Sequence, residues 1–114
     1  MEYNYAAFGI SGLETAVPLL ITEIVGTGAV SPGILFERMT AGPARILGLE
    51  SGTLRAGTPA DLTAIDPNLE KEVDPARFFS KGKNTPLAGR KLKGWPVLTV
   101  AGGKIVFRDG EIID

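Results

Sequence analysis

A glycine-containing loop that runs directly into an apolar helical stripe is the feature that most constrains this chain. Gly9 and Gly12 allow backbone conformations or close approaches that a side chain forbids. Ser11, followed three residues later by Glu14, is typical of a capping box, so we expect a helix from about Gly12. Proline 18 lies inside the run and predicts kinked or loosened first turns. One buried helix face is predicted from the apolar positions at helical spacing: Leu13, Ala16, Val17, Leu20 and Ile24.

Helical patterns continue to residue 48. Residues 26–28, where two glycines flank a threonine, end the first helix near Val25. Ser31–Pro32 predicts a second helix to about residue 40, because a capping residue precedes proline at the first helical position. Pro43 predicts a third, short helix that Gly48 ends.

Strand patterns replace helical ones after residue 49. Residues 52–66 predict a short strand, a turn and a second strand with Leu62, Ala64 and Ile65 inward, and residues 67–74 predict an exposed polar stretch. One helical turn is expected at 75–79. Residues 91–100 predict a strand in which Pro96 implies an edge or a bulge, followed by hairpin strands at 104–108 and 111–113. The predicted class is therefore α+β, with one small antiparallel sheet that contains Leu62, Val97 and Ile105.

Composition limits the chemistry of the chain. It has no histidine and no cysteine, which removes the usual ligands of catalytic zinc and the commonest acid-base group at neutral pH. Carboxylates bind hard cations, but Asp61 and Asp66 flank an apolar strand and residues 70, 72 and 74 are spread along a polar stretch. We predict no metal ligand and no catalytic residue here, and interpret Asp61 as an acceptor for backbone donors at a turn.

Charge and hydropathy exclude further classes of partner. The net charge of −1 gives no reason to expect nucleic acid or an anionic membrane, and no apolar run approaches the length of a membrane span. Residues 80–89 form a basic loop without the spacing of a phosphate-binding loop, so Lys81 and Asn84 are interpreted as structural. Trp95, the single tryptophan, is interpreted as a core or interface anchor.

Four separated strings resemble one enzyme family. The string from Phe8 to Leu20, F-G-I-x-G-L-E-T-A-x-P-L-L, resembles the segment that follows the last barrel strand in bacterial dihydroorotases, the zinc amidohydrolases of pyrimidine biosynthesis. Three more strings resemble that family in matching order: T-x-x-P-A-x-x-L-G at 40–48, G-x-L-x-x-G-x-x-A-D-L at 52–62 and S-K-x-x-N-T-P-x-x-G at 80–89. The chain thus looks like the C-terminal portion of such an enzyme. The resemblance implies that residues 1–49 are the helical end of a (β/α)8 metallo-hydrolase barrel and residues 50–114 its small β-domain.

The resemblance also implies a reaction for the parent enzyme. Dihydroorotases interconvert dihydroorotate and N-carbamoyl-L-aspartate, using zinc-bound hydroxide and an aspartate that shuttles protons. Those groups lie upstream in the family, so this chain alone is expected to bind no zinc and to be inactive. Phe8 and Gly9 match family positions that contact substrate. A cytoplasmic location is also implied.

Two alternatives stay open. The parent resembles, less closely, other cyclic-amide hydrolases of the dihydropyrimidinase or allantoinase type. The other alternative for the parent is a non-catalytic dihydroorotase-like protein that supports aspartate carbamoyltransferase. Histidines upstream of Met1 would indicate catalysis, and their absence a scaffold. Because apolar helix faces and sheet edges would lose their parental partners, we also expect a homo-oligomer, most simply a twofold dimer.

Overall fold

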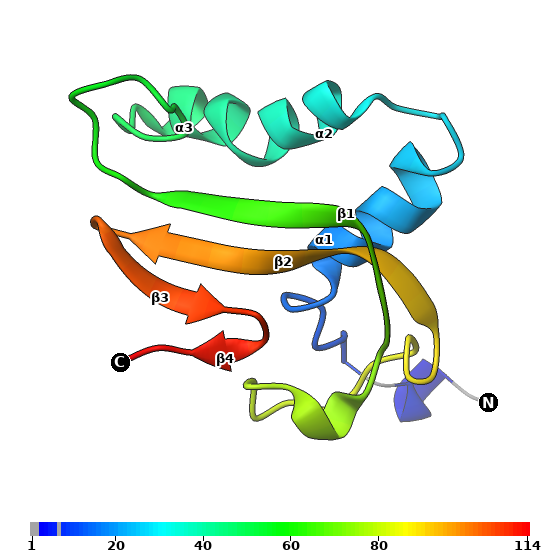
Figure 1. Ribbon diagram of the computed structural model, residues 1–114. Coiled ribbons are helices and arrows are strands. Elements are labelled where there is room, and N and C mark those ends of the chain that lie inside the picture. The colour runs from blue at the N-terminus through cyan, green and yellow to red at the C-terminus, as the bar shows by residue number, and fades with distance from the viewer. Residues whose placement is uncertain (1–2, 7) are drawn as a thin grey trace.

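The computed structural model describes residues 3–6 and 8–114, with helices in the first half of the chain and strands in the second. Figure 1 shows α2 and α3 in a row across the top of the view, while α1 crosses behind β2. The predicted arrangement of helices followed by an antiparallel sheet is confirmed. In chain order the elements are a 3-10 turn (Tyr3–Tyr5), α1 (Ala16–Leu20), a π-helix (Ile21–Val25), α2 (Pro32–Met39), α3 (Ala41–Leu47), β1 (Leu62–Glu72), a second 3-10 turn (Pro75–Arg77), β2 (Lys91–Ala101), β3 (Lys104–Arg108) and β4 (Glu111–Ile112).

The first helix starts later than the capping box predicted. α1 begins at Ala16, and its N-cap residue, Thr15, makes no side-chain capping bond. Ser11 and Glu14 bond instead to a loop that lies 65 to 73 residues further along the chain. The predicted capping box is therefore wrong, because tertiary partners take both side chains.

Proline 18 does not kink the helix where we expected. It lies in the first turn of α1, where a backbone N–H would have no helical partner to lose. The loosening comes later, in the π-helix, where Gly26 N donates to Ile21 O (2.8 Å), five residues back. The predicted end of this helical segment at Val25 is confirmed.

The start of α2 and the end of α3 follow the local sequence. The Ser31 hydroxyl accepts a 3.4 Å hydrogen bond from Ile34 N, and Pro32 is the first residue of α2. Gly48 ends α3 with φ 65°, a left-handed conformation that glycine adopts without strain. The third helix begins at Ala41 rather than at Pro43, which again occupies the first turn.

Within the described residues, the strands form one antiparallel sheet in the order β1-β2-β3-β4. Leu62, Val97 and Ile105 share this sheet, as predicted. Pro96 lies opposite Ile65 next to a register shift, which confirms the predicted bulge. Pro96 does not lie on an edge strand. However, β3 pairs with β2 only from Leu98 onward, so the missing N–H of Pro96 removes no hydrogen bond between β2 and β3.

The first sheet strand differs in position from the prediction. Residues 52–61 contain no strand, so the expected strand-turn-strand unit is wrong. β1 instead continues through most of the stretch predicted to be polar and exposed, because it pairs with β2 as far as Glu72 opposite Lys91. A second register shift, between Asp66 and Glu70, accommodates Pro67 in this long strand.

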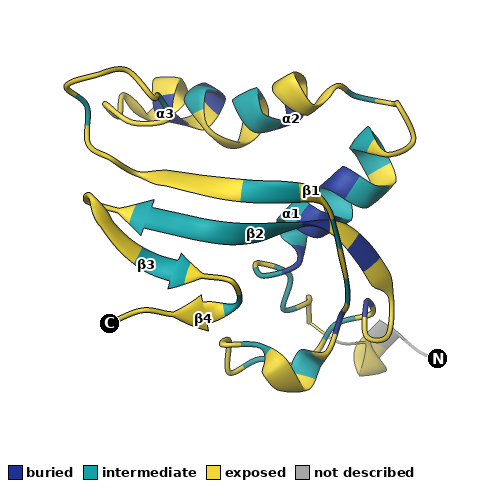
Figure 2. Cartoon of the chain, viewed as in Figure 1, coloured by how far each residue is buried: buried dark blue, intermediate teal, exposed yellow. Residues whose placement is uncertain are grey.

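A small apolar core joins the sheet to the first helix. Val73, Leu87 and Leu92 are buried and pack with Leu19 of α1 and with Trp95. Figure 2 shows that the buried residues are sparse and lie mainly where α1 and the π-helix approach the sheet. The interpretation of Trp95 as a core anchor is confirmed, and its indole N–H donates to Leu92 O at 2.7 Å.

The π-helix attaches directly to β2. Ile21 is buried against Gly94, where an added Cβ would lie 2.5 Å from the Ile21 side chain. The Thr22 hydroxyl accepts a hydrogen bond from Lys93 N (2.9 Å) and donates to Lys93 O (3.3 Å). The helix therefore satisfies the backbone of β2 at a position that β3 does not reach.

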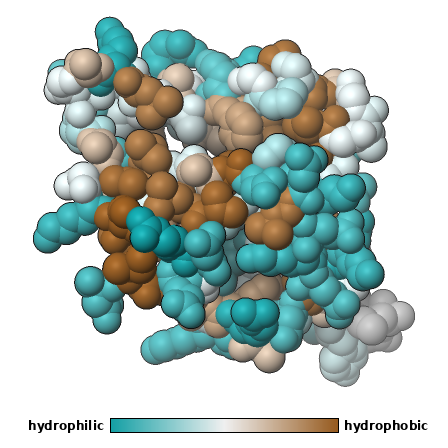
Figure 3. Space-filling model, viewed as in Figure 1, coloured by the Kyte–Doolittle hydropathy of each residue, from teal (hydrophilic) through white to brown (hydrophobic). Residues whose placement is uncertain are grey.

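Burial of the predicted apolar face is incomplete. Val17, Leu20 and Ile24 are half-buried, while Leu13 is 95% exposed. At the start of β1, Leu62 and Ala64 are exposed rather than inward, whereas Ile65 is half-buried. Figure 3 shows apolar side chains at the surface over the left-hand part of the sheet. The strand register places apolar residues of three strands there side by side: Leu62, Val100 and Ile105.

Across residues 3–6 and 8–114, every helix is too short or too polar to cross a lipid bilayer.

Replacing Gly94 with alanine is expected to destabilise the fold more than replacing Gly57 with alanine. Both glycines have φ 88°, so backbone strain is matched. Nothing lies within 4 Å of a Cβ at Gly57, whereas a Cβ at Gly94 meets Ile21. Urea unfolding should give Gly94→Ala an additional loss of about 1–3 kcal/mol, the usual cost of overpacking. Equal losses in the two variants would show that the Ile21 contact adjusts freely.

Candidate functional site

The two residues predicted to contact substrate lie in the segment that leads to α1. The Phe8 side chain is fully exposed. Gly9 has φ 86°, which only glycine adopts readily, and a Cβ there would meet nothing within 4 Å. Backbone conformation, rather than crowding, thus accounts for glycine at this position.

A loop from the second half of the chain holds this segment through Asn84. The Asn84 side-chain amide donates to Gly9 O (2.9 Å), and Asn84 Oδ1 accepts from the Ser11 hydroxyl (2.9 Å). Ser11 N donates to Asn84 O at 2.8 Å. These contacts agree with the structural interpretation of Asn84, whereas the Lys81 side chain is exposed and its role stays a prediction.

Glu14 makes a second connection between the same two segments. Its carboxylate accepts hydrogen bonds from Phe79 N (3.1 Å) and Ser80 N (2.9 Å). Lys83 Nζ donates to Phe78 O (2.6 Å) and fixes the same loop from its other end. No pattern in the sequence indicated these contacts, because local spacing favoured a helix cap for Glu14.

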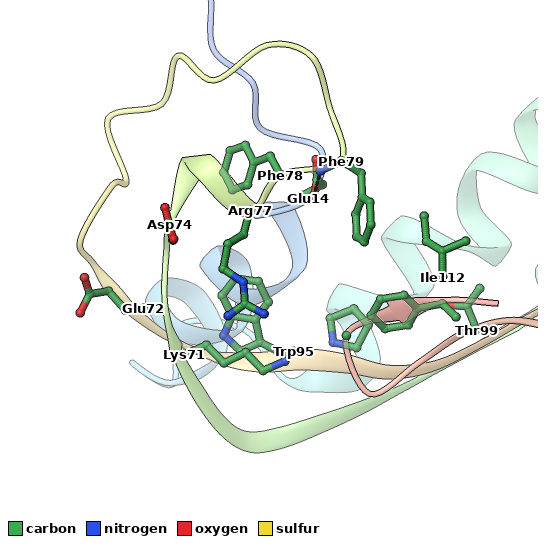
Figure 4. A pocket seen from close by; sticks show the side chains of 13 residues that line it. Glu14, Lys71, Glu72, Asp74, Arg77, Phe78, Phe79, Trp95, Thr99 and Ile112 are labelled. Atoms are coloured by element: carbon green, nitrogen blue, oxygen red, sulfur yellow. Dashed lines mark hydrogen bonds between the residues drawn. The ribbon is translucent and has the colours of Figure 1, made fainter.

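A pocket of about 640 Å³ opens between the sheet and the 3-10 turn that begins at Pro75. Figure 4 shows Arg77 and Lys71 directed toward the Trp95 ring, and Lys71 Nζ lies 5.8 Å from the ring centroid, within cation–π distance. The apolar part of the lining consists of Phe78, Phe79, Trp95, Phe107 and Ile112. The charged part consists of Glu14, Lys71, Glu72, Asp74 and Arg77. Pro96, Thr99 and Gly110 complete the lining.

Sequence reasoning missed this pocket because its residues come from separate strands and turns with no common spacing. Phe8 and Gly9 do not belong to its lining; Glu14 is the lining residue nearest to them in sequence.

Several carboxylates among the described residues accept hydrogen bonds from backbone amides. Asp61 Oδ1 accepts from Gly102 N (2.6 Å), so its predicted role as an acceptor of backbone donors is confirmed, although the donor lies in the β2–β3 turn. Asp66 accepts from the amides of Asn68 and Leu69 beside the bulge. Among these residues, no three Asp or Glu side chains are grouped closely enough to hold a metal ion. With no histidine or cysteine in the sequence, the chain does not fit a zinc site.

Comparison with known proteins decides the family. The sequence model described as "Amidohydrolase family" matches residues 5–106. The chain belongs to the amidohydrolase family.

Two curated relatives of this amidohydrolase chain are dihydroorotases. It is 53% identical to the dihydroorotase of Pelotomaculum thermopropionicum over 112 residues, which cover 98% of this chain and 26% of the relative. It is 52% identical to the dihydroorotase of Bacillus cereus (strain B4264), over 90% of this chain and 24% of that protein. The chain thus spans about a quarter of the length of these relatives.

Solved amidohydrolase structures share the fold. The L-hydantoinase (dihydropyrimidinase) from Arthrobacter aurescens superposes with a TM-score of 0.88 at 37% identity, covering 96% of this chain and 25% of that one. The D-hydantoinase (dihydropyrimidinase) from Thermus sp. gives a TM-score of 0.78 at 25% identity, over 85% of this chain and 22% of that one.

Replacing Glu14 with glutamine is expected to loosen the loop at Phe79 and Ser80. The substitution keeps the size of the side chain but removes the charge and one acceptor oxygen. Amide hydrogen exchange at these two positions should quicken about fivefold to tenfold, since one hydrogen bond contributes about 1 kcal/mol. Glu50→Gln, at an exposed carboxylate, is the matched control. Unchanged exchange in Glu14→Gln would contradict the role of this carboxylate.

Proposed function

We propose that this chain is the C-terminal part of a dihydroorotase, the zinc hydrolase that interconverts dihydroorotate and N-carbamoyl-L-aspartate in de novo pyrimidine biosynthesis. The observation that carries the proposal is 53% identity to a dihydroorotase across almost the whole of this chain. Residues 1–49 then form the helical end of the (β/α)8 barrel, and residues 50–114 form its small β-domain.

In this proposal the metal and the acid-base groups come from the rest of the enzyme, because residues of this chain do not fit a zinc site. The chain itself presents Phe8 and Gly9 to the substrate. Phe8 offers an exposed aromatic face, and Gly9 allows the positive φ of the backbone beside it. Both residues bind and orient the substrate, and neither has a group that transfers a proton at neutral pH.

A second candidate is a hydrolase of another cyclic amide, of the hydantoinase type. The TM-score of 0.88 with the L-hydantoinase from Arthrobacter aurescens favours it. The higher sequence identity to dihydroorotases supports the first candidate. A cytoplasmic location belongs to the first proposal. Association with aspartate carbamoyltransferase belongs to the alternative of a non-catalytic, dihydroorotase-like scaffold.

A chimera tests the proposed function. The matching 112 residues of the Pelotomaculum thermopropionicum dihydroorotase are replaced with those of this chain. The chimera should bind zinc and hydrolyse dihydroorotate within about tenfold of the parental kcat/KM. The isolated 114-residue chain should retain no zinc after dialysis and show no turnover. A folded chimera without activity, or one that prefers hydantoin or dihydrouracil, would contradict the dihydroorotase assignment.

The isolated chain is expected to form a homo-oligomer, most simply a twofold dimer. Large apolar side chains are exposed on both halves of the chain, including Leu13, Ile46 and Leu54. Burying one such side chain contributes about 1.5–3 kcal/mol, so association between copies is favoured. Sedimentation velocity at micromolar concentration should show a dimer that dissociates on dilution. A monomer at every concentration would refute the expectation.

A further inference from the structure

We propose that Asn84 is a positioning residue for substrate binding, because it fixes the backbone on which Phe8 is mounted. The inference rests on the proposed function, in which Phe8 and Gly9 contact the cyclic substrate. It assigns a role in that site to a residue from the other half of the chain.

The side-chain nitrogen and oxygen of Asn84 each form a hydrogen bond with a different group of the segment that contains Phe8 and Gly9. Asn84 Nδ2 donates a 2.9 Å hydrogen bond to the carbonyl oxygen of Gly9, and the two residues are 75 positions apart in sequence. Asn84 Oδ1 accepts from the Ser11 hydroxyl at 2.9 Å, and the Asn84 carbonyl accepts from Ser11 N at 2.8 Å. One residue therefore restrains the backbone on both sides of Ile10.

The neighbouring loop residues leave little freedom around this contact. A Cβ at Gly82 would lie 2.4 Å from Ser11 Oγ, so the loop backbone packs directly against the segment. The hydrogen bonds that Phe79 N and Ser80 N donate to the Glu14 carboxylate hold the start of the same loop. Asn84 thus acts from a loop that is itself anchored.

Phe8 depends on this restraint because its side chain is fully exposed and has no packing of its own in the described structure. Its direction follows from the φ of 86° at Gly9, whose carbonyl Asn84 holds. Loss of the restraint lets the Phe8–Gly9 segment sample other conformations, and binding must then select the competent one. The expected consequence is weaker substrate binding with the chemical step unchanged.

Three substitutions in the chimera separate the contribution of the Asn84–Gly9 hydrogen bond from that of the Asn84–Ser11 hydrogen bond. Asn84→Ala removes both side-chain bonds, and Asn84→Asp keeps an acceptor for Ser11 but loses the donor to Gly9. Ser11→Ala removes only the hydroxyl bond. We expect both Asn84 variants to raise KM for dihydroorotate by about tenfold with kcat changed less than about threefold, whereas Ser11→Ala changes KM by less than about threefold. Asn68→Ala, at an exposed asparagine of β1, is the control and should leave both constants unchanged.

The outcomes distinguish the two proposals. An active chimera in which Asn84→Ala and Asn84→Asp leave KM within about twofold overturns the role of Asn84 but not the proposed function. A parallel fall in kcat and in melting temperature, with KM constant, also overturns it, because that is the signature of a merely structural residue. A folded, inactive chimera without substitutions overturns the proposed function, and the role of Asn84 with it.

A second measurement needs no active enzyme. In the 114-residue chain, NMR should show that the side-chain amide protons of Asn84 exchange with solvent at least about fivefold more slowly than those of Asn68, because one set is hydrogen-bonded. Equal exchange rates would overturn the restraint on Gly9 directly, whether or not the chimera folds.

Discussion

The contact between the π-helix and β2 is the interaction on which the rest of this structure depends. Ile21 can be buried only because Gly94 has no side chain, and Thr22 bonds to both backbone groups of Lys93. Glu23 adds an ion pair with Arg90, directly before β2, so three consecutive helical residues contact one short stretch of the chain at the start of that strand. The widened turns of the π-helix begin at the same place, at Ile21. This contact determines the position of the helical half relative to the sheet. It therefore also limits the positions available to the Phe8–Gly9 segment, which precedes α1.

From that position, polar contacts rather than apolar packing hold the Phe8–Gly9 segment. Asn84 and Glu14 connect it to the loop at residues 78–84, using backbone amides and carbonyls that no strand or helix satisfies. Such bonds are directional, so they set geometry, while each contributes only about 1 kcal/mol to stability. A segment held in this way has a defined conformation without needing an apolar core of its own.

The sparse core is consistent with a chain that spans about a quarter of its relatives' length. Leu13, Ile46 and Leu54 are strongly exposed, and apolar residues of β1, β2 and β3 reach the surface together. In the proposed parent enzyme these faces would pack against the remainder of the barrel. The hydrophobic effect depends on the apolar area removed from water and not on which chain covers it. The same faces therefore favour association between copies when this chain is isolated.

The sequence by itself determined those helix boundaries that depend on a few adjacent residues. Ser31–Pro32 started α2 and Gly48 ended α3, because capping and left-handed φ depend on a few adjacent residues. The absence of histidine and cysteine removed a zinc site from the chain whatever its fold, and the quoted strings pointed to the family. Only the tertiary structure decided that β1 continues past Pro67, and that Ser11 and Glu14 bond to a distant loop. Strand length is set by the partner strand, and a polar side chain bonds to whichever group the fold brings closest; neither is encoded in spacing along the chain.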